Sequence, residues 1–227
     1  MRVRRQCAAV AVAAIALLSG CGVAGETPGA VRGEGPAGFV GQHTEFRSAD
    51  GRIGFRLPPG WATREEPLQS TLEGSLLLQV FDGAGREQAV LIANQSLPSW
   101  ADGDCEPHPY RVIESAELDG FAARIVTRGH DVSPRFVFRV LEAPDGSFAG
   151  SLGLTNMVGG LDRAACVLRT LLVNGSGHTK NLVFATQGGI TVDDARLRFA
   201  DEAAVSAYVA GEEYRALREM FLSLRAD

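Results

Sequence analysis

The chain has 227 residues, of which 22 are basic and 27 are acidic, and its formal net charge at pH 7 is −5. This acidic balance argues against a nucleic-acid-binding surface or an electrostatic grip on anionic lipids, because both need clustered lysines and arginines. A domain of the size of residues 45–227 can bury about 70% of its unfolded surface, so it needs no metal to form a core.

The N-terminal segment has the layout of an export signal. Three arginines, Arg2, Arg4 and Arg5, precede an apolar run of 12 residues from Cys7 to Leu18. Such a run is too short to cross a hydrocarbon core of roughly 30 Å, which needs about 20 helical residues. We therefore interpret residues 1–20 as a cleaved signal peptide rather than a membrane-spanning helix.

Leu18-Ser19-Gly20-Cys21, directly after this run, resembles the lipobox of bacterial lipoproteins. The resemblance implies that a diacylglyceryl group is attached to the Cys21 thiol and that cleavage makes Cys21 the mature N-terminus. Two acyl chains would then hold the protein on the extracytoplasmic face of the cell membrane. The alternative is an ordinary secretory signal with a cysteine near its cleavage site by chance. The Arg4-Arg5 pair leaves open whether export follows the general or the twin-arginine route.

Residues 21–44 contain the predicted lipidated cysteine and a stretch rich in glycine and proline, which predicts a flexible tether. As a random coil, a tether of this length would span about 25 Å. Removal of residues 1–20 takes away three arginines and no acid, which leaves 19 basic and 27 acidic residues and a net charge of −8. We expect the remaining residues, 45–227, to form one globular domain.

The first half of this domain has the patterns of β-strands. Apolar residues alternate over 53–57, and Pro58-Pro59-Gly60 ends that strand. The apolar runs 75–81 and 88–93 flank Asp82-Gly83-Ala84-Gly85, which predicts a hairpin.

Two further hairpins are predicted downstream. Asp119-Gly120 lies between 112–118 and 121–126, and this dipeptide tolerates the positive φ values of tight hairpin turns. The runs 136–141 and 148–154 flank a turn over 143–147 that contains Pro144, Asp145 and Gly146.

The last third of the chain contains the helical patterns. Residues 162–173 fit either a short helix capped by Asp162 or a buried strand, and 181–186 fits a strand. A longer amphipathic helix is predicted to begin at Asp201, because its apolar residues recur near helical spacing as far as Leu224. Together these elements predict an α+β fold, in which an antiparallel sheet built from hairpins packs against the C-terminal helix and, in one reading, a second helix.

The segment Gly54-Phe55-Arg56-Leu57-Pro58-Pro59-Gly60-Trp61, the hairpins and the terminal helix resemble the PsbP-like α/β sandwich lipoproteins of bacteria. This resemblance implies an antiparallel sheet packed with helices and a binding or accessory role. It transfers no catalytic residue, and the stretches 102–109 and 156–180 have no clear place in its pattern.

Cys105 and Cys166 are the only cysteines of the mature chain besides Cys21. In an exported protein such a pair predicts a disulfide, which would close a loop of about 60 residues and stabilise the fold by at most roughly 4 kcal/mol.

A zinc site is the alternative for these cysteines, with His108 and His178 as further ligands. Its spacing departs from the two tight ligand pairs of structural zinc sites. Asp102 and Asp104 lack the spacing of a calcium-binding loop and indicate an exposed turn. We therefore predict no metal and no cofactor.

No motif for covalent catalysis is present, since the chain contains no Gly-x-Ser-x-Gly turn, no Ser-x-x-Lys pair and no glycine-rich phosphate loop. His130, Asp131 and Ser133 have the residue types of a catalytic triad, but sequence neighbours rarely adopt triad geometry, so we interpret them as a polar loop. Trp61 and Trp100 could line a ligand pocket, although a tryptophan after Pro-Pro-Gly is more often a core residue.

The sequence thus favours a non-enzymatic lipoprotein of the cell envelope that binds an unidentified ligand or protein partner and no nucleic acid. The alternative is an envelope hydrolase with an unrecognised active site. That alternative requires a cleft in which His43, His108, His130 or His178 meets a carboxylate and a nucleophile.

Overall fold

This computed structural model of the chain describes residues 44–68, 72–95, 106–119, 125–127, 130–156, 164–173 and 181–226, with backbone alone for 125–127, 130–132 and 173. The chain divides into two units, Met1–Ala37 and Gly38–Asp227, and all described residues belong to the second. The predicted signal peptide, the lipidation of Cys21 and the tether lie outside the described residues, except that Thr44, the last residue of the predicted tether, is the first residue of a strand.

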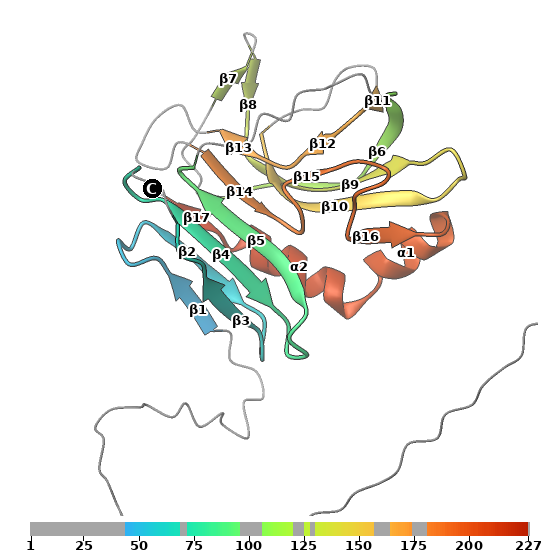
Figure 1. Cartoon of the computed structure of the whole chain (residues 1–227). Coiled ribbons are helices and arrows are strands. Elements are labelled where there is room, and N and C mark those ends of the chain that lie inside the picture. The colour runs from blue at the N-terminus through green and yellow to red at the C-terminus, as the bar shows by residue number, and fades with distance from the viewer. Residues whose placement is uncertain are drawn as a thin grey trace, which may run out of the picture. The chain divides into compact units, whose positions relative to one another are not determined.

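The second unit has the predicted α+β fold, with antiparallel sheets and two helices near its C-terminal end (Figure 1). Ten strands form the large sheet: β3 (Ala62–Glu65), β4 (Leu76–Phe81), β5 (Glu87–Ala93), β6 (His108–Glu117), β9 (Arg135–Glu142), β10 (Phe148–Thr155), β11 (Ala164–Ala165), β13 (Leu172–Val173), β14 (Asn181–Ala185) and β16 (Leu197–Phe199). Their order is β11-β6-β9-β10-β14-β5-β4-β3, and in addition β13 pairs with β14 and β16 with β10.

The remaining strands form three smaller groups: β1 (Thr44–Arg47), β2 (Ile53–Leu57) and β17 (Arg225–Ala226) in one sheet, β7 (Ile125–Thr127) with β8 (His130–Val132), and β12 (Leu168–Arg169) with β15 (Gly189–Ile190). The central strand of the three-stranded sheet is β2, which pairs with β1 on one side and β17 on the other. Its buried residues Ile53, Phe55 and Leu57 alternate as the sequence predicts.

Two of the predicted hairpins are confirmed. β4 pairs with β5, and the turn between them is closed by Asp82, whose carboxylate accepts hydrogen bonds from the backbone N–H groups of Ala84 and Arg86 at 2.9 Å each. β9 pairs with β10 along its whole length, and Gly146 supplies the positive φ, +83°, that the connecting turn needs.

The predicted hairpin of 112–118 with 121–126 is wrong for the described part of these segments. β6 pairs with β9, and β7, which contains Ile125 and Val126, pairs with β8. Residues 121–124 lie outside the described ones. The long β6 gains more by pairing with β9, whose side chains are buried on both faces, than by folding back on a short neighbour.

Residues 164–173, which we call the strap, form the short strands β11, β12 and β13, so the helical reading of 162–173 is wrong over the described positions. Each piece pairs with a different strand: β11 with β6, β12 with β15 and β13 with β14. The predicted strand over 181–186 is confirmed as β14.

The C-terminal segment forms two helices in place of the single predicted one: α1 (Glu202–Val209) and α2 (Glu212–Leu222). Asp201 caps α1 as predicted, since its carboxylate accepts a hydrogen bond from the backbone N–H of Ala204 at 2.8 Å. Ala210 is the C-cap residue of α1. Gly211, which has an extended conformation, is the N-cap residue of α2. Figure 1 shows both helices on one side of the large sheet and β12 on the other.

The central strands of the large sheet, β9, β10 and β14, are buried on both faces. Alternation along β9, β10 and β14 directs five large apolar residues to the face that α2 covers, the helix face: Phe136, Phe138, Leu152, Leu154 and Phe184. The opposite face, the strap face, is covered by the strap and by β15 and contains Arg139, Ser151 and Thr155. At Gly153, a Cβ would lie 2.5 Å from the carbonyl oxygen of Phe184, so only glycine lets β10 and β14 approach this closely.

Candidate functional site

A groove runs along the outer side of α2, and we call it the α2 groove. It consists of two adjoining pockets of about 480 Å³ and 420 Å³, which share Pro58, Pro59, Glu212 and Ala216. The first pocket is also lined by Arg56, Arg215, Glu219, Met220 and Leu222. The second is also lined by Trp61, Asp82, Gly83, Ala84, Arg86 and Glu213. Pockets of this size are suited to small molecules or to short segments of a larger partner.

One wall of the groove comes from the end of β2. Proline has no backbone N–H and therefore cannot continue a strand pair, so Pro58 and Pro59 end β2. Gly60, at φ +76°, turns the chain so that the backbone N–H of Trp61 donates to the carbonyl oxygen of Pro58 at 3.1 Å. This turn fixes both prolines opposite α2.

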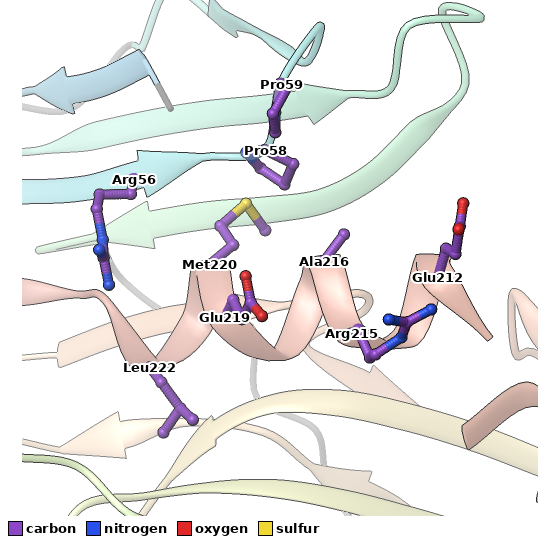
Figure 2. Close-up of a pocket in the computed structure, with 9 residues that line it drawn as sticks. All are labelled: Arg56, Pro58, Pro59, Glu212, Arg215, Ala216, Glu219, Met220 and Leu222. Carbon is purple, nitrogen blue, oxygen red and sulfur yellow. The ribbon is translucent and has the colours of Figure 1, made fainter. Parts of the chain in front are cut away.

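The other wall is α2, an amphipathic helix whose inner residues Tyr214, Leu217 and Phe221 are buried in the core. Figure 2 shows Met220 and Ala216 pointing from α2 toward the prolines, and Arg56 extending from β2 toward the helix. Met220 is only 1% exposed, so it forms an apolar floor beneath the charged side chains of the groove.

The first pocket contains two cations and two anions at its rim. Arg56, Arg215, Glu212 and Glu219 are all exposed, and within the described residues none of them takes part in an ion pair shorter than 4.0 Å. Arg215 donates from Nε to the carbonyl oxygen of Gly211 at 3.4 Å. These four groups are therefore available to a ligand.

In the second pocket, the charges of Asp82, Arg86 and Glu213 are already paired, while Glu212 is shared with the first pocket. Arg86 lies 2.7 Å from Asp82 and 3.8 Å from Glu213, measured between guanidinium nitrogen and carboxylate oxygen. Hydrogen bonds from the backbone N–H of Arg86 and from the side chains of Gln88 and Arg86 lower the pKa of Asp82. Trp61, partly buried at this end, packs against the main core and also lines the groove. A ligand-binding role for it stays a prediction.

A second polar cluster lies on the strap face around Arg139, whose side chain is 4% exposed. Its Nη2 donates to the carbonyl oxygen of Arg169 and to Oγ1 of Thr170, the latter at 3.3 Å, while its Nε has no partner. Burial lowers the pKa of Arg139 to about 10, so the group stays protonated at neutral pH. Because these contacts all join sheet to strap, the cluster fastens the strap and offers no open site.

A third cluster joins α2 to β6. Tyr214 donates from its hydroxyl to Glu114, and Nε of Arg218 lies 2.6 Å from the same carboxylate. Partial burial raises the pKa of Glu114, but the hydrogen bonds from Tyr214 and Arg218 outweigh this effect and lower it overall. A carboxylate held ionised in this way secures the helix and is not poised to transfer a proton.

The structure tests only part of the predicted disulfide. Cys166 is disulfide-bonded, and Cys105 lies outside the described residues. Ala165 pairs with His108, so the strap carries Cys166 past the beginning of β6, three residues after Cys105. This pairing supports a bond between the two cysteines, which stays a prediction.

Several other candidate residues also lie outside the described part of the chain: His43, Trp100, Asp102, Asp104 and His178. His130 and Asp131 lie in β8 rather than in the predicted polar loop, and only their backbone is described. Among the described residues, no group of three or more metal-ligating side chains could hold a metal ion. The zinc alternative for Cys105, His108, Cys166 and His178 thus stays untested.

His108 is the one histidine with a described side chain, and it lines neither pocket of the α2 groove. The described lining of this groove contains no serine, threonine, cysteine or histidine. Guanidinium groups, carboxylates and an apolar floor can bind and orient a ligand, but they provide no nucleophile with an adjacent base.

The sequence did not identify the α2 groove, because its walls are about 150 residues apart in the chain. The only sequence signals were Pro58-Pro59, interpreted as a strand end, and the mixed charges on the outer face of the last helix. No helix of the described part is long and apolar enough to cross a membrane. No family model, curated protein or solved structure matches this chain.

Proposed function

We propose that this chain is a lipoprotein of the cell envelope, attached to the extracytoplasmic face of the cell membrane through Cys21, and that its domain binds a ligand or partner. The sequence Leu18-Ser19-Gly20-Cys21 supports the attachment. The α2 groove supports the binding role, because it combines an apolar floor with four charged side chains that form no ion pair within the described part of the chain. The confirmed α+β fold fits the binding or accessory role that the resemblance to PsbP-like lipoproteins implies.

The binding role rests on one observation: the arginines and glutamates that line the first pocket form no ion pairs with other described residues. In the second pocket, Arg86 forms an ion pair with Asp82 at 2.7 Å. Around the first pocket the corresponding groups flank an opening instead of closing it. A groove of this kind is preorganised for a ligand that carries charge.

The anchor is tested by the intact mass of the native protein extracted from membranes, before and after thiol reduction. We expect a mass that fits a chain beginning at Cys21 plus acyl groups, which gains the two hydrogens of one reduced disulfide. A species without acyl groups would contradict the attachment, and free thiols before reduction would contradict the Cys105–Cys166 bond.

The hydrolase alternative has its own test. It predicts slow cleavage of generic ester or peptide substrates that is lost when His43, His108, His130 and His178 are replaced one at a time by glutamine. Activity that survives all four substitutions, or no activity in the unmodified protein, would exclude a histidine-dependent hydrolase.

A further inference from the structure

The described chain begins directly beside the α2 groove. Thr44, the first residue of β1, pairs with Leu57, and Leu57 is followed by Pro58 and Pro59 of the groove wall. Under the proposed function, on which this inference rests, 22 residues lie between the acylated Cys21 and Thr44. As a random coil, a connection of this length would span about 25 Å and would keep the groove close to the lipid surface.

The charges of the first pocket match a ligand that has both signs of charge. Arg56 and Arg215 present guanidinium groups, which bind phosphate in a bidentate manner. Glu212 and Glu219 present carboxylates, which accept hydrogen bonds from an ammonium group. On α2, Arg215 lies one turn from both of these glutamates, so the signs alternate along the helix.

The same charges disfavour anionic lipids. A phosphate group alone would meet the two carboxylates as well as the arginines, and the net charge of −8 on residues 21–227 repels anionic surfaces. A volume of about 480 Å³ above Met220, Ala216 and Leu222 can hold a headgroup and its glycerol, with the apolar floor beneath the glycerol carbons.

We propose that the first pocket of the α2 groove binds the headgroup of a membrane phospholipid that carries both a phosphate and a primary ammonium group, such as phosphatidylethanolamine. Arg215 binds the phosphate, and Glu212 or Glu219, each one turn from it on α2, accepts hydrogen bonds from the ammonium. Arg56, at the β2 end of the pocket beyond Glu219, adds a second positive charge there. Occupancy would hold the domain against the membrane instead of leaving it at the end of its tether.

Vesicle co-sedimentation tests this proposal with a chain that has no acyl group. The chain spans residues 21–227 with Cys21→Ser; every described strand and helix lies between Thr44 and Ala226, so none is removed. Vesicles are made of phosphatidylcholine alone, or of phosphatidylcholine with phosphatidylethanolamine or with phosphatidylglycerol. We expect binding that increases with phosphatidylethanolamine, whose ammonium can donate hydrogen bonds, and not with phosphatidylglycerol.

Paired variants locate the site. The double variant R56Q/R215Q is expected to weaken binding to phosphatidylethanolamine vesicles by about tenfold or more. The matched control R47Q/R64Q removes the same charge from exposed arginines of β1 and β3 that do not line the groove, and it should leave binding unchanged. The variant E212Q/E219Q should lose the preference for phosphatidylethanolamine over phosphatidylglycerol.

Three results would overturn the proposal: absent binding to all vesicles, equal binding to the vesicles with phosphatidylethanolamine and those with phosphatidylglycerol, or equal loss of binding in R56Q/R215Q and R47Q/R64Q. In each case circular dichroism and thermal unfolding of the variants show whether the fold is intact. A negative result here leaves the proposed attachment through Cys21 standing, because the intact mass of the native protein tests it separately. It would direct attention to a peptide partner, or to the chain's own residues before Thr44, as the occupant of the groove.

Discussion

On the helix face, the large sheet packs against α2 through aromatic rings: the ring centres of Phe184 and Phe221 lie 4.8 Å apart, and those of Phe136 and Phe221 lie 6.1 Å apart. On the strap face, the same strands direct Arg139, Ser151 and Thr155 toward the strap, which they hold by hydrogen bonds. Both faces exclude water, but the helix face does so by apolar burial alone, whereas the strap face combines smaller apolar clusters with hydrogen bonds of buried polar side chains. Apolar burial depends on filled volume, whereas a polar contact depends on each partner, so the two faces should respond differently to substitution.

The largest effect is expected on the helix face. Phe221→Ala removes a fully buried ring between β9, β14 and α2 and should lower the free energy of unfolding by about 3–5 kcal/mol. Denaturant unfolding measures this change. Val112→Ala, at a residue that is 53% exposed, is the control and should change stability by less than about 0.5 kcal/mol. Similar losses in both variants would contradict the assignment of Phe221 to the core.

The next effect concerns the strap face. Cys166→Ser should cost about 2–4 kcal/mol if the chain-entropy account of its disulfide holds. Hydrogen exchange should show where the loss falls: the backbone N–H of Thr170, which donates to Gly188, should lose protection before the N–H groups of α2. If the backbone N–H groups of the strap and of α2 lost their protection together, the strap and the helices would unfold as one unit. The two faces of the sheet would then not differ in local stability.

A smaller effect tests how α1 begins. Asp201→Ala removes the carboxylate that caps the helix and should cost about 1 kcal/mol, while Asp201→Ser, which keeps a capping oxygen, should cost only part of this. Thermal unfolding of both variants provides the comparison. An equal loss for serine and alanine would mean that the side chain of Asp201 acts in some way other than as a cap.

The smallest effect is the sharpest test of the strap face. Arg139 is buried with no carboxylate beside it among the described residues, so its charge is costly and offsets its hydrogen bonds. Arg139→Met keeps the volume and removes the charge, and it should change the free energy of unfolding by less than about 1 kcal/mol. Arg139→Ala, which leaves a cavity, should be clearly worse. A loss above about 3 kcal/mol in the methionine variant would show that the guanidinium itself holds the strap.

Local sequence signals predicted the local parts of this fold. Asp82 and Gly146 determine their turns through contacts within a few residues, and both hairpins are confirmed. The pairing of β6 with β9 and of β17 with β2 joins distant segments, and no signal near Asp119 or Arg225 indicates these partners. The division of the last helix at Ala210 could have been suspected, since Gly211 follows directly.

The candidate site was less predictable than the fold. The α2 groove exists because Pro58 and Pro59 face a helix about 150 residues later, and periodicity carries no information about such a meeting. The position of Arg139 could have been recognised from the sequence, because this arginine interrupts a run of apolar residues that is typical of a strand buried on both faces. An arginine in such a run must find polar partners, and the strap provides them.

The pairing of β1 with β2 also has a mechanical consequence. A pull on the chain before Thr44 acts at the open end of the β1–β2 pair, opposite the turn that joins Arg47 to Ile53. Tension therefore opens the hydrogen bonds one after another instead of loading them together. β1 can peel away and lengthen the connection by about 13 Å, at roughly 3.4 Å per residue, while β2 stays paired with β17. This strand would act as an extensible link that yields before the core is strained.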